Sequence, residues 1–189
     1  MKRIYIAGPW VFRPNTEDFK ADVRALLHGS GTEPVFPTDG LPDGTDMDVS
    51  SAASIQRHCL VHLDACDAIL AEVSPWYGHM PDAGTVFEVG YAAAKGKQVF
   101  LWTTNGTPLR DRLIAEDRME VDARGGGTHD SDGNLLEDFG APVNAMLAVY
   151  PTYRSLREAC EAGEAVRARN PSAPLAGSVI GCICHVPHA

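Results

Sequence analysis

Hydrophobic residues along this chain gather in short runs that alternate with segments whose apolar residues recur at helical spacing. The runs predict four buried strands, at 2–7, 33–36, 68–73 and 98–103. The helical spacing predicts three helices between and after them, at about 16–27, 50–66 and 85–95. Gly29 and Gly96 stand where glycine commonly ends a helix. Strands and helices that alternate with short connections are typical of a parallel α/β sheet.

We therefore expect one doubly wound, flavodoxin-like or Rossmann-like parallel sheet of five strands, with helices on both faces and ligands at the carboxyl ends of the strands. Residues 104–139 show no clear period, and their glycine-rich part, 125–133, is expected to be a mobile loop. A further helix is predicted from Thr152 or Ser155. We expect 1–169 to form the domain and 170–189, rich in Pro, Ala and Gly, to form a C-terminal tail.

Composition narrows the class of protein. Hydrophobic residues make up 44% and charged residues 22%, which indicates a globular domain, and the net charge of -9 with no basic stripe argues against nucleic acid as a partner. No apolar run approaches the ~20 residues of a membrane helix, so we expect no membrane partner. The five cysteines are odd in number and lack secreted-scaffold spacing, which predicts free thiols and a cytoplasmic protein. One C-x-C-H at 182–185 has no second half, and no metal site is expected.

Three carboxylates, Asp67, Asp82 and Glu88, are expected at the carboxyl edge of the sheet. Glu88 lies in a helix that is apolar on nearly all faces, so it either pairs with another group or lines a cleft, and the helix dipole favours its charged form. Simpler roles also fit: Asp82 as a helix N-cap, Asp67 as a turn or helix-end cap, and Glu88 as a solvated first-turn acid. Paired carboxylates suit acid–base and covalent chemistry at an acetal carbon.

Four segments carry a resemblance to a known family. They are YIAGPWVF at 5–12, CDAILAEVSP at 66–75, PDAGTVFEVGYA at 81–92 and FGAPVNAML at 139–147. In this order they resemble the motifs of the nucleoside 2-deoxyribosyltransferases, and together they extend over most of the first 150 residues. Each motif alone is modest in specificity, whereas all four in order make a strong match.

The resemblance implies four roles in a reaction that transfers 2-deoxyribose between nucleobases. Glu88 would be the nucleophile that attacks C1′ and forms a covalent glycosyl-enzyme. Tyr5 would bind and orient that carboxylate. Asp67 would be the acid that protonates the departing base, and Asp82 would hold a sugar hydroxyl, the 5′-OH.

The same resemblance implies further substrate contacts. Gly8, Trp10 and Phe12 would line the base pocket, since aromatic walls suit a flat heterocycle. Asn144 and Met146, from the late motif, would contact substrate, with Asn144 reaching the site of a neighbouring subunit in a homo-oligomer. The partners implied are 2′-deoxynucleosides and nucleobases, and no cofactor is implied.

Several alternatives stay open from the residues. The same fold also serves N-glycosidases of nucleoside 5′-monophosphates, but Asp82 would repel a phosphate, which favours the free nucleoside. The residues do not distinguish transfer from plain hydrolysis. They also leave the preference for purine or pyrimidine bases open; the loop 37–45 would set it, and Asp39 in this loop is either a base contact or a turn residue. A catalytically silent nucleoside sensor on this scaffold would not need the carboxylates of Glu88 and Asp67, and their presence argues against this alternative. The missing G-x-G-x-x-G argues against a nicotinamide-dependent oxidoreductase.

Overall fold

The computed structural model describes residues 2–40, 49–116, 119–121, 127–130 and 132–169. Its main sheet is parallel, with five strands in the order β2-β1-β3-β4-β8. These strands are β1 (Lys2–Ala7), β2 (Thr32–Val35), β3 (Ala68–Glu72), β4 (Gln98–Trp102) and β8 (Thr152–Tyr153). The predicted fold class is confirmed. β8 has only two residues, too few for a pattern of hydrophobic positions to reveal.

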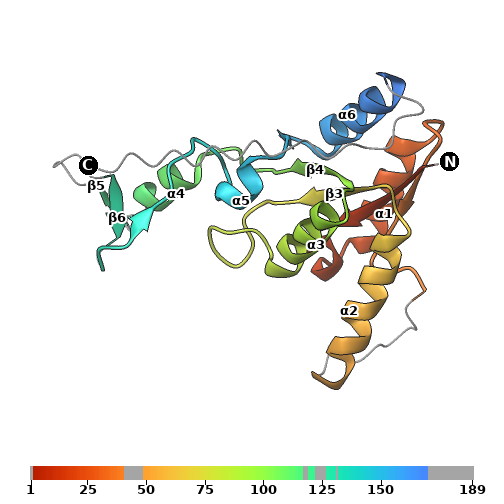
Figure 1. Cartoon of the computed structure of the whole chain (residues 1–189), viewed down its shortest axis with the longest axis horizontal. Coiled ribbons are helices and arrows are strands. Elements are labelled where there is room, and N and C mark those ends of the chain that lie inside the picture. Colours follow the sequence, from red (N-terminus) through yellow and green to blue (C-terminus); the bar gives the residue numbers. More distant parts are fainter. Residues whose placement is uncertain (1, 41–48, 117–118, 122–126, 131, 170–189) are drawn as a thin grey trace.

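Helices cover both faces of this sheet (Figure 1). α2 (Val49–Asp64) and α3 (Ala83–Ala94) enclose one hydrophobic core with Tyr5 and Ile69. α1 (Thr16–Leu27) and α6 (Leu156–Arg169) enclose a second core with Ile4 and Leu70. Because successive side chains of a strand point to opposite faces, each central strand contributes to both cores, which explains its continuous hydrophobic run.

The stretch expected to be irregular, 104–139, contains α4 (Leu109–Ala115) and a small antiparallel sheet of β5 (Met119–Val121), β6 (Thr128–Asp130) and β7 (Leu135–Leu136). Figure 1 shows this sheet at the end of the molecule far from the N-terminus. The Asp130 carboxylate accepts hydrogen bonds of 3.0 and 2.7 Å from the amides of Asp132 and Asn134. These polar residues therefore close a hairpin, and the expectation of a loop is wrong for the described part of 125–133.

Other expectations fall outside the described residues. These are the tail at 170–189 and the second half of the loop at 37–45, so the domain boundary stays a prediction. Asp39, in the first half of that loop, binds the amide of Phe36 through Oδ2 at 2.9 Å, which is the behaviour of a turn residue. Within the described part of the chain, no helix combines the length and apolar character needed to cross a bilayer.

The strand order places a ligand-binding crevice at one point of the sheet. From β1 the chain passes to β2 on one side and then to β3 on the other. Ligands in such sheets bind outside the carboxyl ends of the strands at this reversal. Here those ends carry Gly8, followed by the short 3-10 helix η1 (Pro9–Phe12), and Glu72.

Candidate active site

Glu88 and Tyr5, predicted to act together, are in contact. Glu88 lies in the middle of α3, which the buried Val89 and Ala92 hold against the sheet. Tyr5 lies in β1 with its side chain fully buried on the same face. Its hydroxyl donates a hydrogen bond of 2.6 Å to Oε1 of Glu88. The two residues are 83 positions apart in the chain, so only the packing of α3 on the sheet brings them together.

Burial determines the charge state of this pair. Loss of solvent raises the pKa of Glu88 from 4.5 to about 7; the Tyr5 hydrogen bond opposes this rise and the negative charge of Asp82 adds to it. The expected help from the helix dipole does not prevail, because Glu88 lies beyond the first turn of α3, where that effect fades. Burial and the nearby Glu88 also raise the pKa of Tyr5, so its hydroxyl stays protonated as a donor.

A cavity of about 430 Å³ lies beside Glu88, between α2 and α3. Its lining residues are Ala52, Ile55, Gln56, Cys59, Leu60, Gly84, Phe87 and Glu88. An apolar wall with a few polar groups, at this volume, is typical of a small-molecule site. Among the described residues no group of three His, Cys, Asp or Glu side chains is arranged to hold a metal ion. The chemistry available in this cavity is that of a half-buried carboxylate and its hydrogen-bond donors.

Asp82 begins α3 as its N-cap. Its Oδ2 accepts hydrogen bonds from the amide of Thr85 at 2.8 Å and from the Thr85 hydroxyl at 2.9 Å. This is the simpler of the two roles that the sequence allowed. Capping occupies Oδ2 and orients the carboxylate, and its charge lies close enough to Glu88 to raise the pKa of that group. Asp82 is therefore a second negative group beside the cavity.

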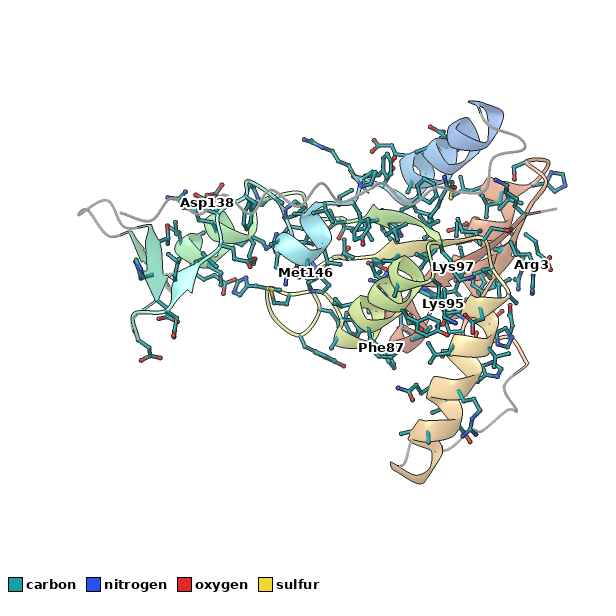
Figure 2. All side chains as sticks on the ribbon, in the orientation of Figure 1. Arg3, Phe87, Lys95, Lys97, Asp138 and Met146 are labelled. Carbon is teal, nitrogen blue, oxygen red and sulfur yellow. The ribbon has the colours of Figure 1, made fainter. Side chains whose placement is uncertain are left out.

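Asp67 lies at the opposite edge of the sheet, so the prediction that it joins the other carboxylates is wrong. It precedes β3, and its Oδ2 accepts a 2.9 Å hydrogen bond from the amide of Arg3 near the start of β1. It lines a separate, much smaller cavity that shares no residue with the one beside Glu88. Figure 2 shows Arg3 well apart from Phe87, which lines the larger cavity. A residue that precedes a parallel strand reaches the amino edge, not the carboxyl edge.

Trp10 and Phe12 were predicted to line the base pocket, but neither lines the cavity beside Glu88. Trp10 is fully buried in the core on the α1 face, where its ring stacks on Phe19 and meets Phe36 edge-on. Phe12 is 54% exposed and stacks on Trp76, with ring centroids 6.2 Å apart. The prediction treated both aromatic rings as ligand walls, whereas η1 turns Trp10 inward and leaves Phe12 on the surface.

Glu72, which is buried, forms an ion pair with the half-exposed Arg13, and the sequence did not predict this pair. Glu72 ends β3 with no exposed surface, and its Oε1 accepts a 2.6 Å hydrogen bond from Nη2 of Arg13. Its Oε2 is buried without a partner among the described residues. By strand alternation Glu72 points to the α1 face, whereas Glu88 lies on the other. The sequence did contain an indication of this pair. Glu72 is an acid at the end of an apolar strand, and a buried carboxylate requires a partner.

Gly8, predicted to line the base pocket, occupies a tight position between this ion pair and the core. Its φ is +150°, and a Cβ built there would lie 2.8 Å from Cβ of Glu72 and 2.8 Å from Cδ1 of Trp10. Glycine is therefore needed for η1 to pass directly over the end of β3. Gly8 shapes the switch point of the sheet without lining the cavity beside Glu88.

Asn144 and Met146 lie on a different part of the surface from the cavity of their own chain. Asn144 stands at the N-cap of α5 (Ala145–Ala148), and its Oδ1 is buried without a partner among the described residues. Met146 is 76% exposed, while its neighbour Leu147 anchors α5 in the core. Neither residue lines the cavity beside Glu88.

Comparisons relate this chain to known proteins. A family model described as nucleoside 2-deoxyribosyltransferase matches residues 4–146. A solved 2-deoxyribosyltransferase from Leishmania mexicana is 35% identical, with a TM-score of 0.69, over 90% of this chain and 99% of that one. An uncharacterised protein of Schizosaccharomyces pombe is 28% identical over 156 residues, 76% of this chain and 74% of the yeast protein. A conserved protein from Enterococcus faecalis V583, 19% identical with a TM-score of 0.52 over 88% of this chain and 99% of that one, shares the fold.

Proposed function

Because the chain belongs to the nucleoside 2-deoxyribosyltransferase family, we propose that it exchanges the base of free 2′-deoxynucleosides through a covalent bond between C1′ and Glu88. The observation that carries this proposal is the Tyr5–Glu88 hydrogen bond at the wall of a 430 Å³ cavity. It supplies a positioned carboxylate next to space for a small molecule. Base exchange of this kind fits the reuse of nucleosides and bases within a cell.

In the first half-reaction, a Glu88 oxygen bonds to C1′ while the C1′–N bond breaks and its electron pair leaves with the base. The transition state carries positive charge on the sugar, which the carboxylate stabilises, and a 2-deoxy sugar forms such a cation more readily than ribose does. Tyr5 holds Oε1 at 2.6 Å and so keeps the carboxylate oriented. In the second half-reaction, a nitrogen of another base bonds to C1′ while the C1′–O bond breaks and Glu88 leaves as a carboxylate. The N–H proton of this base passes to solvent, from which the base released first takes up a proton.

Asp82 is proposed to face the 5′ position of the sugar. It lies six residues before Glu88, about one and two-thirds helical turns, close enough for its charge to act on Glu88. This negative charge tolerates a 5′-hydroxyl and repels a 5′-phosphate. Its capping bonds with Thr85 leave Oδ1 available to accept a hydrogen bond from a hydroxyl. Selection of the free nucleoside over the nucleotide follows.

Asp82→Ser should weaken the rejection of 2′-deoxynucleoside 5′-monophosphates. Serine still caps α3, so the helix is preserved while the charge is removed. The ratio of kcat/KM for nucleoside to that for nucleotide should fall about tenfold. Steady-state kinetics with 2′-deoxyinosine and its 5′-monophosphate measures this ratio, and Asp82→Asn, which also lacks the charge, should behave alike. An unchanged ratio in both variants would show that Asp82 does not face the 5′ position.

We further propose that the protein acts as a cytoplasmic homo-oligomer in which Asn144 and Met146 serve a site of a neighbouring subunit. Met146 and Phe87 are large apolar side chains that are 76% and 50% exposed, and Figure 2 marks them on α5 and α3. Apolar surface of this kind favours contact with another copy. Cys59 and Cys66 carry free thiols, which suit a reducing compartment.

A chromatographic assay tests the proposed reaction. The protein is incubated with 2′-deoxyinosine, with and without adenine. We expect hypoxanthine together with 2′-deoxyadenosine when adenine is present, because adenine captures the sugar from Glu88. Hypoxanthine and free deoxyribose with no new nucleoside would make the protein a hydrolase. Release of base from a 2′-deoxynucleotide alone would refute the preference for free nucleosides, and no reaction with either class would refute the enzymatic role.

A further inference from the structure

We propose that Cys59 is a positioning residue for Glu88. Together with Tyr5, the Cys59 thiol holds the Glu88 carboxylate at the cavity wall. The consequence for catalysis rests on the proposed function, whereas the contact itself does not. Cys59 lies on α2 and is half-buried with a free thiol. It lines the same cavity as Glu88, and it packs against the core cluster that contains Tyr5. Three elements, β1, α2 and α3, thus each bring one side chain to the same point.

The chemistry of the three groups is complementary. Cys59 and Glu88 line the same cavity, which places the Cys59 thiol where it can donate a hydrogen bond to the Glu88 carboxylate. Burial raises the pKa of the Cys59 thiol, so it keeps its proton at neutral pH and donates rather than accepts toward the carboxylate. A donor favours the charged form of a carboxyl group, and the bond from Cys59 accordingly lowers the pKa of Glu88 against the larger effect of burial.

Few other described groups affect the pKa of Glu88. Asp82, at the start of α3, raises its pKa, and Tyr5 on β1 lowers it. The strands under α3 present only apolar side chains to it, Ile69 and Ala71 from β3 and Val99 and Leu101 from β4. The remaining residues that line the cavity carry no charge. Removal of the thiol would therefore leave Tyr5 as the donor to this carboxylate among the described side chains.

Cys59→Ala tests this role, with Cys59→Ser as the conservative variant. The protonation of Glu88 is followed by carboxyl ¹³C NMR, with its resonance assigned by its loss in Glu88→Gln, and the pH profile of kcat/KM is recorded in parallel. With the thiol donor removed and only Tyr5 left, the carboxylate is less stable, so the pKa of Glu88 should rise by about 0.5–1 unit in Cys59→Ala, and the acid limb of the profile should move to higher pH by the same amount. Cys59→Ser, whose hydroxyl donates, should stay close to the native value.

Cys66→Ala is the matched control, because Cys66 is a more deeply buried thiol of the same core whose Sγ donates to the carbonyl of His62. It should leave the titration of Glu88 unchanged. If Cys59→Ala does not fold, Cys59→Val removes the donor and keeps the volume. The inference would be overturned if the pKa of Glu88 stayed at the wild-type value in Cys59→Ala or Cys59→Val. It would also be overturned if that pKa rose equally in Cys59→Ser or Cys66→Ala. The NMR titration needs no turnover, so a native protein that exchanges no bases would refute the proposed function alone.

Discussion

Glu88→Gln is expected to lower kcat/KM for base exchange by at least about a thousandfold, since removal of a nucleophile from a covalent mechanism has effects of this size or larger. The amide is similar in shape but cannot form the glycosyl ester. The measurement is the rate of 2′-deoxyadenosine formation from 2′-deoxyinosine and adenine. Asp64→Asn is a suitable control, because Asp64 is a solvent-exposed carboxylate that binds Tyr91 and Lys95 of the α3 region. More than about a tenth of native activity in Glu88→Gln would exclude the role of nucleophile.

The same variant tests the charge state of Glu88 through stability. The native carboxyl titrates at about 7, against an ordinary value of 4.5 in the unfolded chain, so the folded state binds this proton more tightly. The contribution of the group to native stability is complete below pH 4.5 and is lost as the pH rises through 7. Glu88→Gln lacks this loss. The difference in free energy of unfolding, Glu88→Gln minus wild type, should rise by about 2–3 kcal/mol between pH 4 and pH 8. Urea unfolding at the two pH values measures this difference. A pH-independent difference would contradict the raised pKa.

Gly8→Ala is expected to destabilise the protein by about 3 kcal/mol or more, or to prevent folding. At φ +150° the added Cβ lies 2.8 Å from carbon atoms of Glu72 and Trp10. Neither atom can move easily, because Cβ of Glu72 is attached directly to β3 and Trp10 is packed in the core. The midpoint of thermal unfolding should fall by roughly 6–12 °C at this protein size.

Gly29→Ala separates the two causes of that loss. Gly29 also has a positive φ, +81°, but a Cβ there has no atom within 4 Å, so only backbone strain is introduced. We expect this control to lose about 1 kcal/mol. If Gly8→Ala were no less stable than Gly29→Ala, the close approach between η1 and β3 would not constrain the fold.

The sequence alone was sufficient for the features that depend on neighbours in the chain. Buried parallel strands are continuous hydrophobic runs, so β1, β3 and β4 were placed nearly to the residue. Asp82 three residues before Thr85 at the start of a helix is a local capping pattern, and the structure contains that bond. Tyr5 and Glu88 were paired only through a resemblance to the family motifs, since no local pattern connects β1 to α3.

Tertiary structure decided which edge or face each side chain reaches. Asp67 was assigned to the wrong edge although it directly precedes a predicted parallel strand, whereas its contact with the amide of Arg3 on β1 depends on the pairing of the two strands. Trp10 points into the core because η1 folds back over β3, and the partner of Glu72 comes from a loop 59 residues away. Such contacts arise from packing between elements remote in sequence, which periodicity and propensity do not encode. The same reason hid Cys59, whose proximity to Glu88 exists only where α2 and α3 pack together.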